Sequence, residues 1–282
     1  MPMTQRSLAC LNPQGFHTIA YTEWGAPERP ALVCAHGMTR NGRDFDMLAA
    51  ALEESWRVVC PDVAGRGRSG WLPDYKDYGY PQYLADMTAL IARLDVESVD
   101  WVGTSMGGLI GMMLAAQLNS PIRRLVINDI GPFIPRAFLA RLRDYVGTDP
   151  RFPDRNALEA YLRQVHAPFG PLGGNQWRHL AEHGARRLQD GGYGLAYDPA
   201  IATAAFTADE PEDVEMWEIW ERVACPVLVL RGAKSDLLLP ETVQRMTESG
   251  PGCDVAEIAG CGHAPALMDA GQIAIVRSWF EQ

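Results

Sequence analysis

Residues 103–108 of the chain read Gly-Thr-Ser-Met-Gly-Gly, which is the pattern G-x-S-x-G. They follow the apolar run 99–102 and open the segment 109–118, which has the composition of a helix. In a strand–turn–helix setting, G-x-S-x-G forms a nucleophile elbow, a strained turn that exposes a reactive serine. The flanking glycines allow strand and helix to approach closely, and the helix directs free N–H groups at Ser105. The stretch predicts a nucleophilic serine; a plain glycine–serine turn is the alternative.

Two residues far along the chain complement the serine. A serine hydroxyl is a weak nucleophile at neutral pH, so it needs a base that a third group orients. His263 lies in a Gly-His pair after a predicted strand at 254–258, and Asp236 follows a predicted strand at 226–230. The order serine, acid, histidine is that of hydrolases with a nucleophile elbow. We therefore predict that His263 is the base and that Asp236 orients it.

Two rival residues stay open. Asp129 also follows a predicted strand, at 122–127, so it is an alternative acid, although we favour Asp236. His36 follows the apolar run 31–35 and would be an alternative base. We interpret His36 instead as a residue that shapes the loop after that run.

Predicted strands and helices alternate through the first half of the chain. The strands are 31–35, 57–60, 99–102 and 122–127, and the helices between them are 44–52, 83–94 and 109–118. This alternation predicts a parallel sheet with helices on both faces. A strand at 16–23 comes before it, and strands at 226–230 and 254–258 with helices at 241–248 and 272–280 come after it.

The pattern breaks between 133 and 213. This segment is rich in proline, arginine and glycine, and its apolar residues have helical spacing without a clean run typical of a buried strand. We interpret it as a helical insertion above the sheet.

Together these features resemble the α/β-hydrolase fold family over nearly the full chain. The landmarks that carry the resemblance are His36-Gly37, the turn 62–69, the elbow at Ser105, the stretch 232–236 and Gly262-His263. The resemblance implies an α/β fold with an eight-stranded, mostly parallel sheet and a helical cap after the sixth strand. It divides the chain into a first core part (1–132), a cap (133–213) and a second core part (214–282).

The resemblance also implies roles for individual residues. Ser105 would be the nucleophile, His263 the general acid–base, and Asp236 the residue that fixes the histidine tautomer. Some members of the family carry the acid after the sixth strand, the position of Asp129. Haloalkane dehalogenases and epoxide hydrolases of this fold have an aspartate at the elbow, so the serine argues against both.

The resemblance further implies an oxyanion hole and a pocket. The backbone N–H groups of Met38 and Met106 would bind the oxyanion, so polar side chains are not needed there. Cap residues that could line a substrate pocket are Phe133, Phe138, Trp177 and Tyr193.

The expected reaction is hydrolysis of a small or medium carboxylic ester or lactone without a cofactor or metal. Hydrolysis of a carbon–carbon bond next to a ketone, as in ring-cleavage product hydrolases, uses the same residues and is the alternative enzyme. A slow or non-catalytic ligand-sensing protein is the alternative from another class.

Composition limits the partners. The net charge of −10 disfavours nucleic acid, because phosphate binding needs clustered Lys and Arg. Cys253, Cys261 and His263 lack a C-x-x-C pair and a fourth ligand, so we expect no zinc site.

Residues 1–10 lack a signal-peptide pattern, and no apolar stretch is long enough for a membrane span, so we expect a cytoplasmic protein with a small-molecule substrate. The oligomeric state is left open.

A second glycine motif has a structural interpretation. Residues 65–70 read Gly-Arg-Gly-Arg-Ser-Gly, formally G-x-G-x-x-G. A dinucleotide fingerprint must open a helix, whereas this one runs into 71–74, Trp-Leu-Pro-Asp. We therefore predict a turn and no dinucleotide site.

Overall fold

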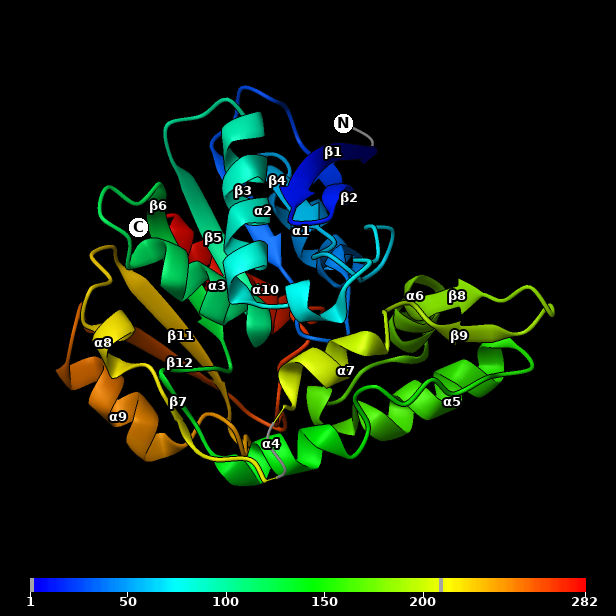
Figure 1. Ribbon diagram of the computed structural model, residues 1–282. Coiled ribbons are helices and arrows are strands. Elements are labelled where there is room, and N and C mark those ends of the chain that lie inside the picture. The colour runs from blue at the N-terminus through cyan, green and yellow to red at the C-terminus, as the bar shows by residue number, and fades with distance from the viewer. Residues whose placement is uncertain (1–2, 208–209) are drawn as a thin grey trace.

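The computed structural model describes residues 3–207 and 210–282, and its centre is an eight-stranded sheet (Figure 1). The strand order is β1-β2-β4-β3-β5-β6-β11-β12, in which β1, β2 and β4 pair antiparallel and all other neighbours pair parallel. The strands are β1 Thr4–Asn12, β2 Gly15–Trp24, β3 Ala31–Ala35, β4 Arg57–Pro61, β5 Val99–Thr104, β6 Ile122–Asn128, β11 Val227–Gly232 and β12 Asp254–Ile258. The eight-stranded, mostly parallel sheet that the resemblance implied is confirmed.

Helices cover both faces of the sheet (Figure 1). Those of the core are α1 Asp46–Leu52, α2 Tyr80–Arg93, α3 Met106–Ala115, α8 Trp217–Trp220, α9 Pro240–Glu248 and α10 Ala270–Phe280, with 3-10 turns η1 Gly42–Phe45 and η2 Tyr75–Asp77. The side chains of α1 and α10 share one core cluster with one face of the sheet, and those of α2, α3, α8 and α9 share the other.

The central strand β3 shows why its sequence is apolar throughout. Leu32 and Cys34 point into the α1–α10 cluster, whereas Ala31, Val33 and Ala35 point into the opposite cluster. Successive side chains of a strand alternate between faces, so a strand covered on both sides buries every residue.

Residues 133–213, which we call the cap, follow β6. The cap holds β7 Phe133–Ile134, α4 Arg136–Arg143, α5 Arg155–Val165, η3 Ala167–Phe169, α6 Gly174–Gly184, β8 Ala185–Arg187, β9 Tyr193–Leu195 and α7 Ala200–Ala205. Its residues 208–209 lie outside the described part of the chain. β7 pairs with β10 Val214–Glu215, and β8 pairs with β9, so the cap contains short strands that the sequence did not predict. The three-part division of the chain stays a prediction.

The cap docks on the carboxyl edge of the parallel strands (Figure 1). The turn after β4 bonds to it: the N–H of Gly67 donates to the carbonyl of Ala196, and that of Asp198 to Gly65, both at 2.8 Å. Residues 65–70 form a turn and do not open a helix, as predicted. The contact of this turn with the cap was not predicted.

None of the helices in the described residues has the length and apolarity needed to cross a lipid bilayer. The predicted cytoplasmic location and the predicted lack of a nucleic-acid partner stay predictions.

Candidate active site

Ser105 sits in a strained turn between β5 and α3. Its backbone has φ 52° and ψ −116°, a left-handed φ that non-glycine residues seldom adopt. A Cβ atom on Gly103 would lie 2.2 Å from the carbonyl oxygen of Gly107, and one on Gly107 would lie 2.0 Å from that of Ala35. Both glycines are therefore required by close backbone approach, and the turn has the geometry of a nucleophile elbow.

His263 lies between the serine and a carboxylate. Its Nε2 is 3.0 Å from the Oγ of Ser105, and its Nδ1 is 2.9 Å from the Oδ2 of Asp129. An ionised carboxylate only accepts hydrogen bonds, so this network assigns the proton to Nδ1 and leaves Nε2 free to accept from the hydroxyl. The ring of Phe138 meets the imidazole edge-on with centroids 4.9 Å apart, and this contact fixes the ring plane.

The carboxylate beside His263 corrects the preference for Asp236. Asp129 is fully buried, and it also accepts the N–H of Gly232 at 2.7 Å and the hydroxyl of Ser235 at 2.6 Å. The side chain of Asp236 is 53% exposed and pairs with Arg141 at 2.8 Å. The end of β11 and the loop after it therefore do not supply the acid. They supply two hydrogen-bond donors that hold Asp129.

Met38 and Met106 are predicted to supply the backbone N–H groups of an oxyanion hole, and this role stays a prediction. Met106 is the first residue of α3, so its N–H has no acceptor within the helix. The carbonyl of Gly37 accepts from Nδ1 of His36 at 2.7 Å and from the N–H of Arg40 at 3.1 Å. In a trans peptide the C=O and N–H groups point in opposite directions, so this anchoring turns the N–H of Met38 away from His36.

His36 is a structural residue in this geometry. Its Nε2 accepts the N–H of Val63 at 2.9 Å while Nδ1 donates to Gly37, so both ring nitrogens are engaged. Burial lowers the pKa of His36 to about 4, which keeps the ring neutral at pH 7. The interpretation of His36 as a residue that shapes its loop agrees with these contacts.

A buried cation lies behind the two methionines. The side chain of Arg66 is fully buried and donates to the carbonyls of Met38 and Ala64 at 2.8 Å and to the hydroxyl of Tyr83 at 2.9 Å. Its Nη2 also lies 3.5 Å from the Sδ of Met106. Within the described residues, no carboxylate forms an ion pair with it. If the two methionine N–H groups bind an oxyanion, as predicted, the positive charge of Arg66 stabilises it.

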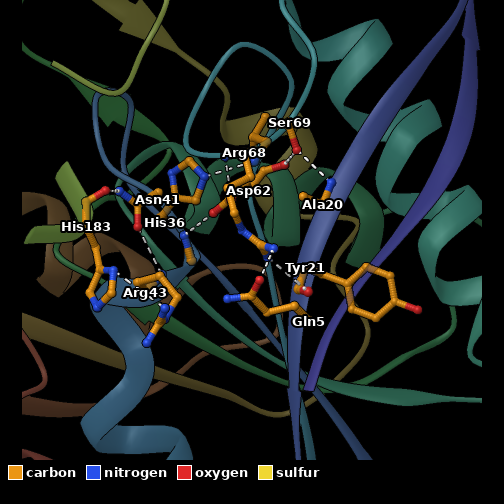
Figure 2. Close-up of polar contacts among 12 residues, drawn as sticks. Gln5, Ala20, Tyr21, His36, Asn41, Arg43, Asp62, Arg68, Ser69 and His183 are labelled. Carbon is orange, nitrogen blue, oxygen red and sulfur yellow. Dashed lines mark hydrogen bonds and ion pairs between the residues drawn. The ribbon is translucent and has the colours of Figure 1, made fainter. Parts of the chain in front are cut away.

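The turn that carries Arg66 is held by Asp62 (Figure 2). The buried carboxylate accepts the N–H groups of Gly42 at 2.8 Å and Arg68 at 2.9 Å. Ser69 donates its hydroxyl to the Asp62 carbonyl and accepts the N–H of Ala20. Asp62 thus serves the turn that it begins.

A cavity opens above the serine between the core and the cap. With its open mouth its volume is about 780 Å3. Its wall includes Met38, Arg40, Ser105, Arg141, Leu142, Tyr145, Val165, His166, Pro168, Phe169, Leu180 and His263. Most of the cap side chains in this wall are apolar, and an apolar cavity with a few polar groups suits a small molecule.

The predicted pocket residues divide into two groups. Phe138 contacts His263 directly. Its helix α4 also supplies the cavity residue Leu142, and the cavity residue Tyr145 follows shortly after the end of α4. Trp177 is buried on α6 beneath Arg163, and Tyr193 on β9 lies under the guanidinium groups of Arg155 and Arg187. None of the four predicted pocket residues is part of the described cavity wall: Trp177, Tyr193 and Phe133 in β7 lie away from it, and Phe138 contacts His263 without lining the cavity.

Sequence reasoning missed several wall residues. The signal for Leu142 and Tyr145 was present, because they continue the helical spacing of Phe138. His166 and Phe169 follow α5 in an irregular stretch, where no periodicity indicates which side chains face inward.

One side-chain cluster has the composition of a metal site. Ligand atoms of Asp46, His179 and His183 lie within 4.8 Å of one another where α6 meets the core. The guanidinium of Arg43 already bonds the Asp46 carboxylate, with Nε at 2.8 and 2.9 Å from its oxygens. Nη1 of Arg43 also lies 3.5 Å from Nδ1 of His183 (Figure 2). A cation there would meet a fixed positive charge, so we assign no metal to the cluster.

Comparisons with known proteins agree with the fold described above. A family model described as "Alpha/beta hydrolase family" matches residues 32–274. A 3-hydroxybutyrate-oligomer hydrolase of Cupriavidus necator is 49% identical over 280 residues, 96% of this chain and 95% of that protein. A 2-(acetamidomethylene)succinate hydrolase of Mesorhizobium japonicum is 27% identical over 83% of this chain and 81% of its own. The crystal structure of a candidate hydrolase from Rickettsia typhi is 32% identical with a TM-score of 0.92, covering 100% of this chain and 99% of that one.

Proposed function

Since this chain belongs to the alpha/beta hydrolase family and is a hydrolase, we propose that it cleaves carboxylic esters through an acyl-enzyme on Ser105. The observation that supports this most directly is the hydrogen-bonded series from Asp129 through His263 to the Oγ of Ser105. The series ends at a strained elbow on the cavity wall, where a bound ester carbonyl can meet the hydroxyl.

In the first half of the reaction Oγ of Ser105 attacks the ester carbonyl carbon. His263 takes the hydroxyl proton on Nε2, and the negative charge of the tetrahedral intermediate falls on the former carbonyl oxygen. The N–H groups of Met38 and Met106 are proposed to donate to that oxygen. The carbon–oxygen bond to the alcohol then breaks, and His263 returns the proton to the leaving alkoxide.

In the second half a water molecule releases the acyl group. His263 removes a proton from the water, whose oxygen attacks the acyl carbon. The bond to Oγ breaks, and Oγ recovers the proton from Nε2. Asp129 stays ionised throughout, holds the Nδ1 proton and stabilises the imidazolium that forms in each half.

The proposed substrates are short linear oligoesters of 3-hydroxybutyrate. The protein of Cupriavidus necator that acts on 3-hydroxybutyrate oligomers aligns with almost the full length of this chain. Two features of the cavity favour a small substrate: the cap covers Ser105, and the cavity wall is largely apolar.

The test compares wild type with Ser105→Ala on the 3-hydroxybutyrate dimer and on p-nitrophenyl esters from acetate to decanoate. Loss of the nucleophile should lower turnover by about a millionfold. Ser7→Ala, a serine on the exposed side of β1, is the matched control and should keep full activity. A fluorophosphonate probe should react with the Ser105 hydroxyl with loss of HF, so the peptide that contains Ser105 should gain the mass of the probe minus HF.

Two outcomes would contradict the proposal. Activity that survives in Ser105→Ala would place the chemistry on another residue. A folded wild-type protein that is inert on every ester would exclude an esterase and direct attention to carbon–carbon bond hydrolysis or ligand sensing.

A further inference from the structure

His166 occupies an unusual place in the cavity wall. It directly follows α5, is only 9% exposed, and lines the same cavity as Ser105 and His263. Its ring stacks on that of Phe169, with centroids 4.6 Å apart and planes inclined by 21°. This stacking holds the imidazole in a fixed orientation.

The ring nitrogens of His166 have no protein partner. In residues 3–207 and 210–282, only its backbone N–H and C=O form hydrogen bonds, to Leu162 and Phe169. The ring lines the cavity, so a ligand or water there can form hydrogen bonds with its nitrogens without displacing a protein partner. The imidazole is the polar exception in a stretch of wall formed by Leu142, Val165 and Phe169.

The ring is uncharged when the enzyme works. Burial, followed by the charges of Arg40 and His263, lowers the pKa of His166 well below its usual value. A neutral imidazole offers one donor and one acceptor. It therefore matches a hydroxyl group, which also donates and accepts, better than it matches a carboxylate.

The buried guanidinium of Arg40 on this wall does not turn it into a carboxylate-binding site. Nε and Nη2 of Arg40 bond the carboxylate of Asp44 at 2.8 and 2.7 Å, so its charge is already paired. This part of the cavity therefore suits an uncharged oxygen atom of a ligand.

We infer that His166 is a specificity-determining residue that binds the 3-hydroxyl group of the substrate's acyl chain. The inference rests on the proposed function, because an acyl group must be attached to Ser105 for its hydroxyl to reach the cap. An apolar pocket hardly distinguishes an acyl chain from its hydroxylated form, whereas a wall with a hydrogen-bonding group rejects the chain that lacks the hydroxyl. His166 thus supplies selectivity that the apolar wall alone lacks.

The experiment compares two esters that differ only in that hydroxyl, p-nitrophenyl 3-hydroxybutyrate and p-nitrophenyl butyrate. The kcat/KM ratio of the two is measured for wild type, His166→Leu and His166→Gln. Wild type should prefer the hydroxylated ester by about tenfold, the effect of one hydrogen bond to an uncharged group. His166→Leu should bring the ratio close to one by losing activity on the hydroxylated ester alone, and His166→Gln should keep part of the preference.

His183→Leu is the matched control, because it makes the same substitution in the cap outside the described cavity wall. It should leave the ratio unchanged. Should His166→Leu fail to fold by circular dichroism, the His166→Gln ratio decides.

Each contrary result has a distinct meaning. A wild-type ratio of one, or equal losses on both esters in the His166 variants, would overturn the inference and leave the esterase intact. A wild-type protein inert towards both esters would overturn the proposed function and the inference with it.

Discussion

Asp129 combines three roles at one position. It directly follows β6 in a left-handed conformation with φ 57°, it is fully buried, and it bonds His263 through Oδ2. The N–H of Gly232 and the hydroxyl of Ser235 hold both carboxylate oxygens, so the orientation of His263 is determined by a rigid group.

Replacing each aspartate in turn should therefore show whether Asp129 or Asp236 orients His263. Asp129→Asn presents an amide to His263, favours the wrong tautomer and should lower kcat by about 10^3- to 10^4-fold. Asp236→Asn removes an exposed ion pair with Arg141, worth at most about 1 kcal/mol, and should change kcat less than about fivefold. Steady-state assays on one p-nitrophenyl ester measure both, and equal effects of the two changes would contradict the assignment.

Sequence alone could identify both aspartates but could not choose between them. Each follows a strand, and the chain order serine, acid, histidine is satisfied by either. The deciding contacts come from Gly232 and Ser235, which are separated from Asp129 by the entire cap. The burial of Arg66 could not be predicted for the same reason. The sequence placed Arg66 in a turn, but its complete burial depends on residues from three other segments.

Among the elements, the buried strands were predicted best. β3, β4 and β6 appear within a residue or two of the expected bounds, because a strand covered on both faces leaves a continuous apolar run. The edge strand β1 was missed, since most of its residues are exposed and no buried pattern marks it. The hairpin of β8 and β9 was missed for a similar reason: each strand has only three residues, and arginines occupy two of the first three positions.

The junction of β5 and α3 should tolerate no added side chain. Gly107→Ala would place a Cβ atom 2.0 Å from the carbonyl of Ala35, so helix and strand must separate. We expect a loss of about 1–3 kcal/mol in the free energy of unfolding, together with reduced esterase activity, measured by urea denaturation and a p-nitrophenyl ester assay.

Gly174→Ala is the control for this change, because nothing lies within 4 Å of the new methyl group at the start of α6. Alanine favours helices, so stability should stay the same or rise by up to about 1 kcal/mol. If both variants behaved alike, close packing at the elbow would be the wrong explanation.

At the scale of the whole molecule, buried neutral histidines link stability to pH. The pKa of His36 is about 4 in the folded protein and 6.5 when unfolded. Between these values the unfolded chain binds a proton that the folded chain does not. The free energy of unfolding therefore falls as the pH drops from 6.5 towards 4, by up to about 1.4 kcal/mol per pH unit from this residue.

The measurement compares urea unfolding at about pH 7 and pH 5 for wild type and His36→Gln. His166 and His183, whose pKa values are also lowered by burial, act in the same direction, while Asp62 and Asp86, whose pKa values burial raises, oppose it. These groups remain in both proteins, so the difference between the two pH slopes isolates His36. The wild-type slope should be steeper, and identical slopes would show that His36 is protonated alike in both states.

The short ladder of β7 and β10 brings the two ends of the cap together. Phe133 faces Glu215 and Ile134 faces Val214, so the chain departs from the core and rejoins it at neighbouring points. A segment whose ends meet in this way can be exchanged for another of different length without rerouting the strands beneath it. Substrate recognition and bond cleavage can then change independently. Substitutions within the cap alter which molecule binds, while the proposed catalytic serine, histidine and aspartate at the edge of the sheet keep the same reaction.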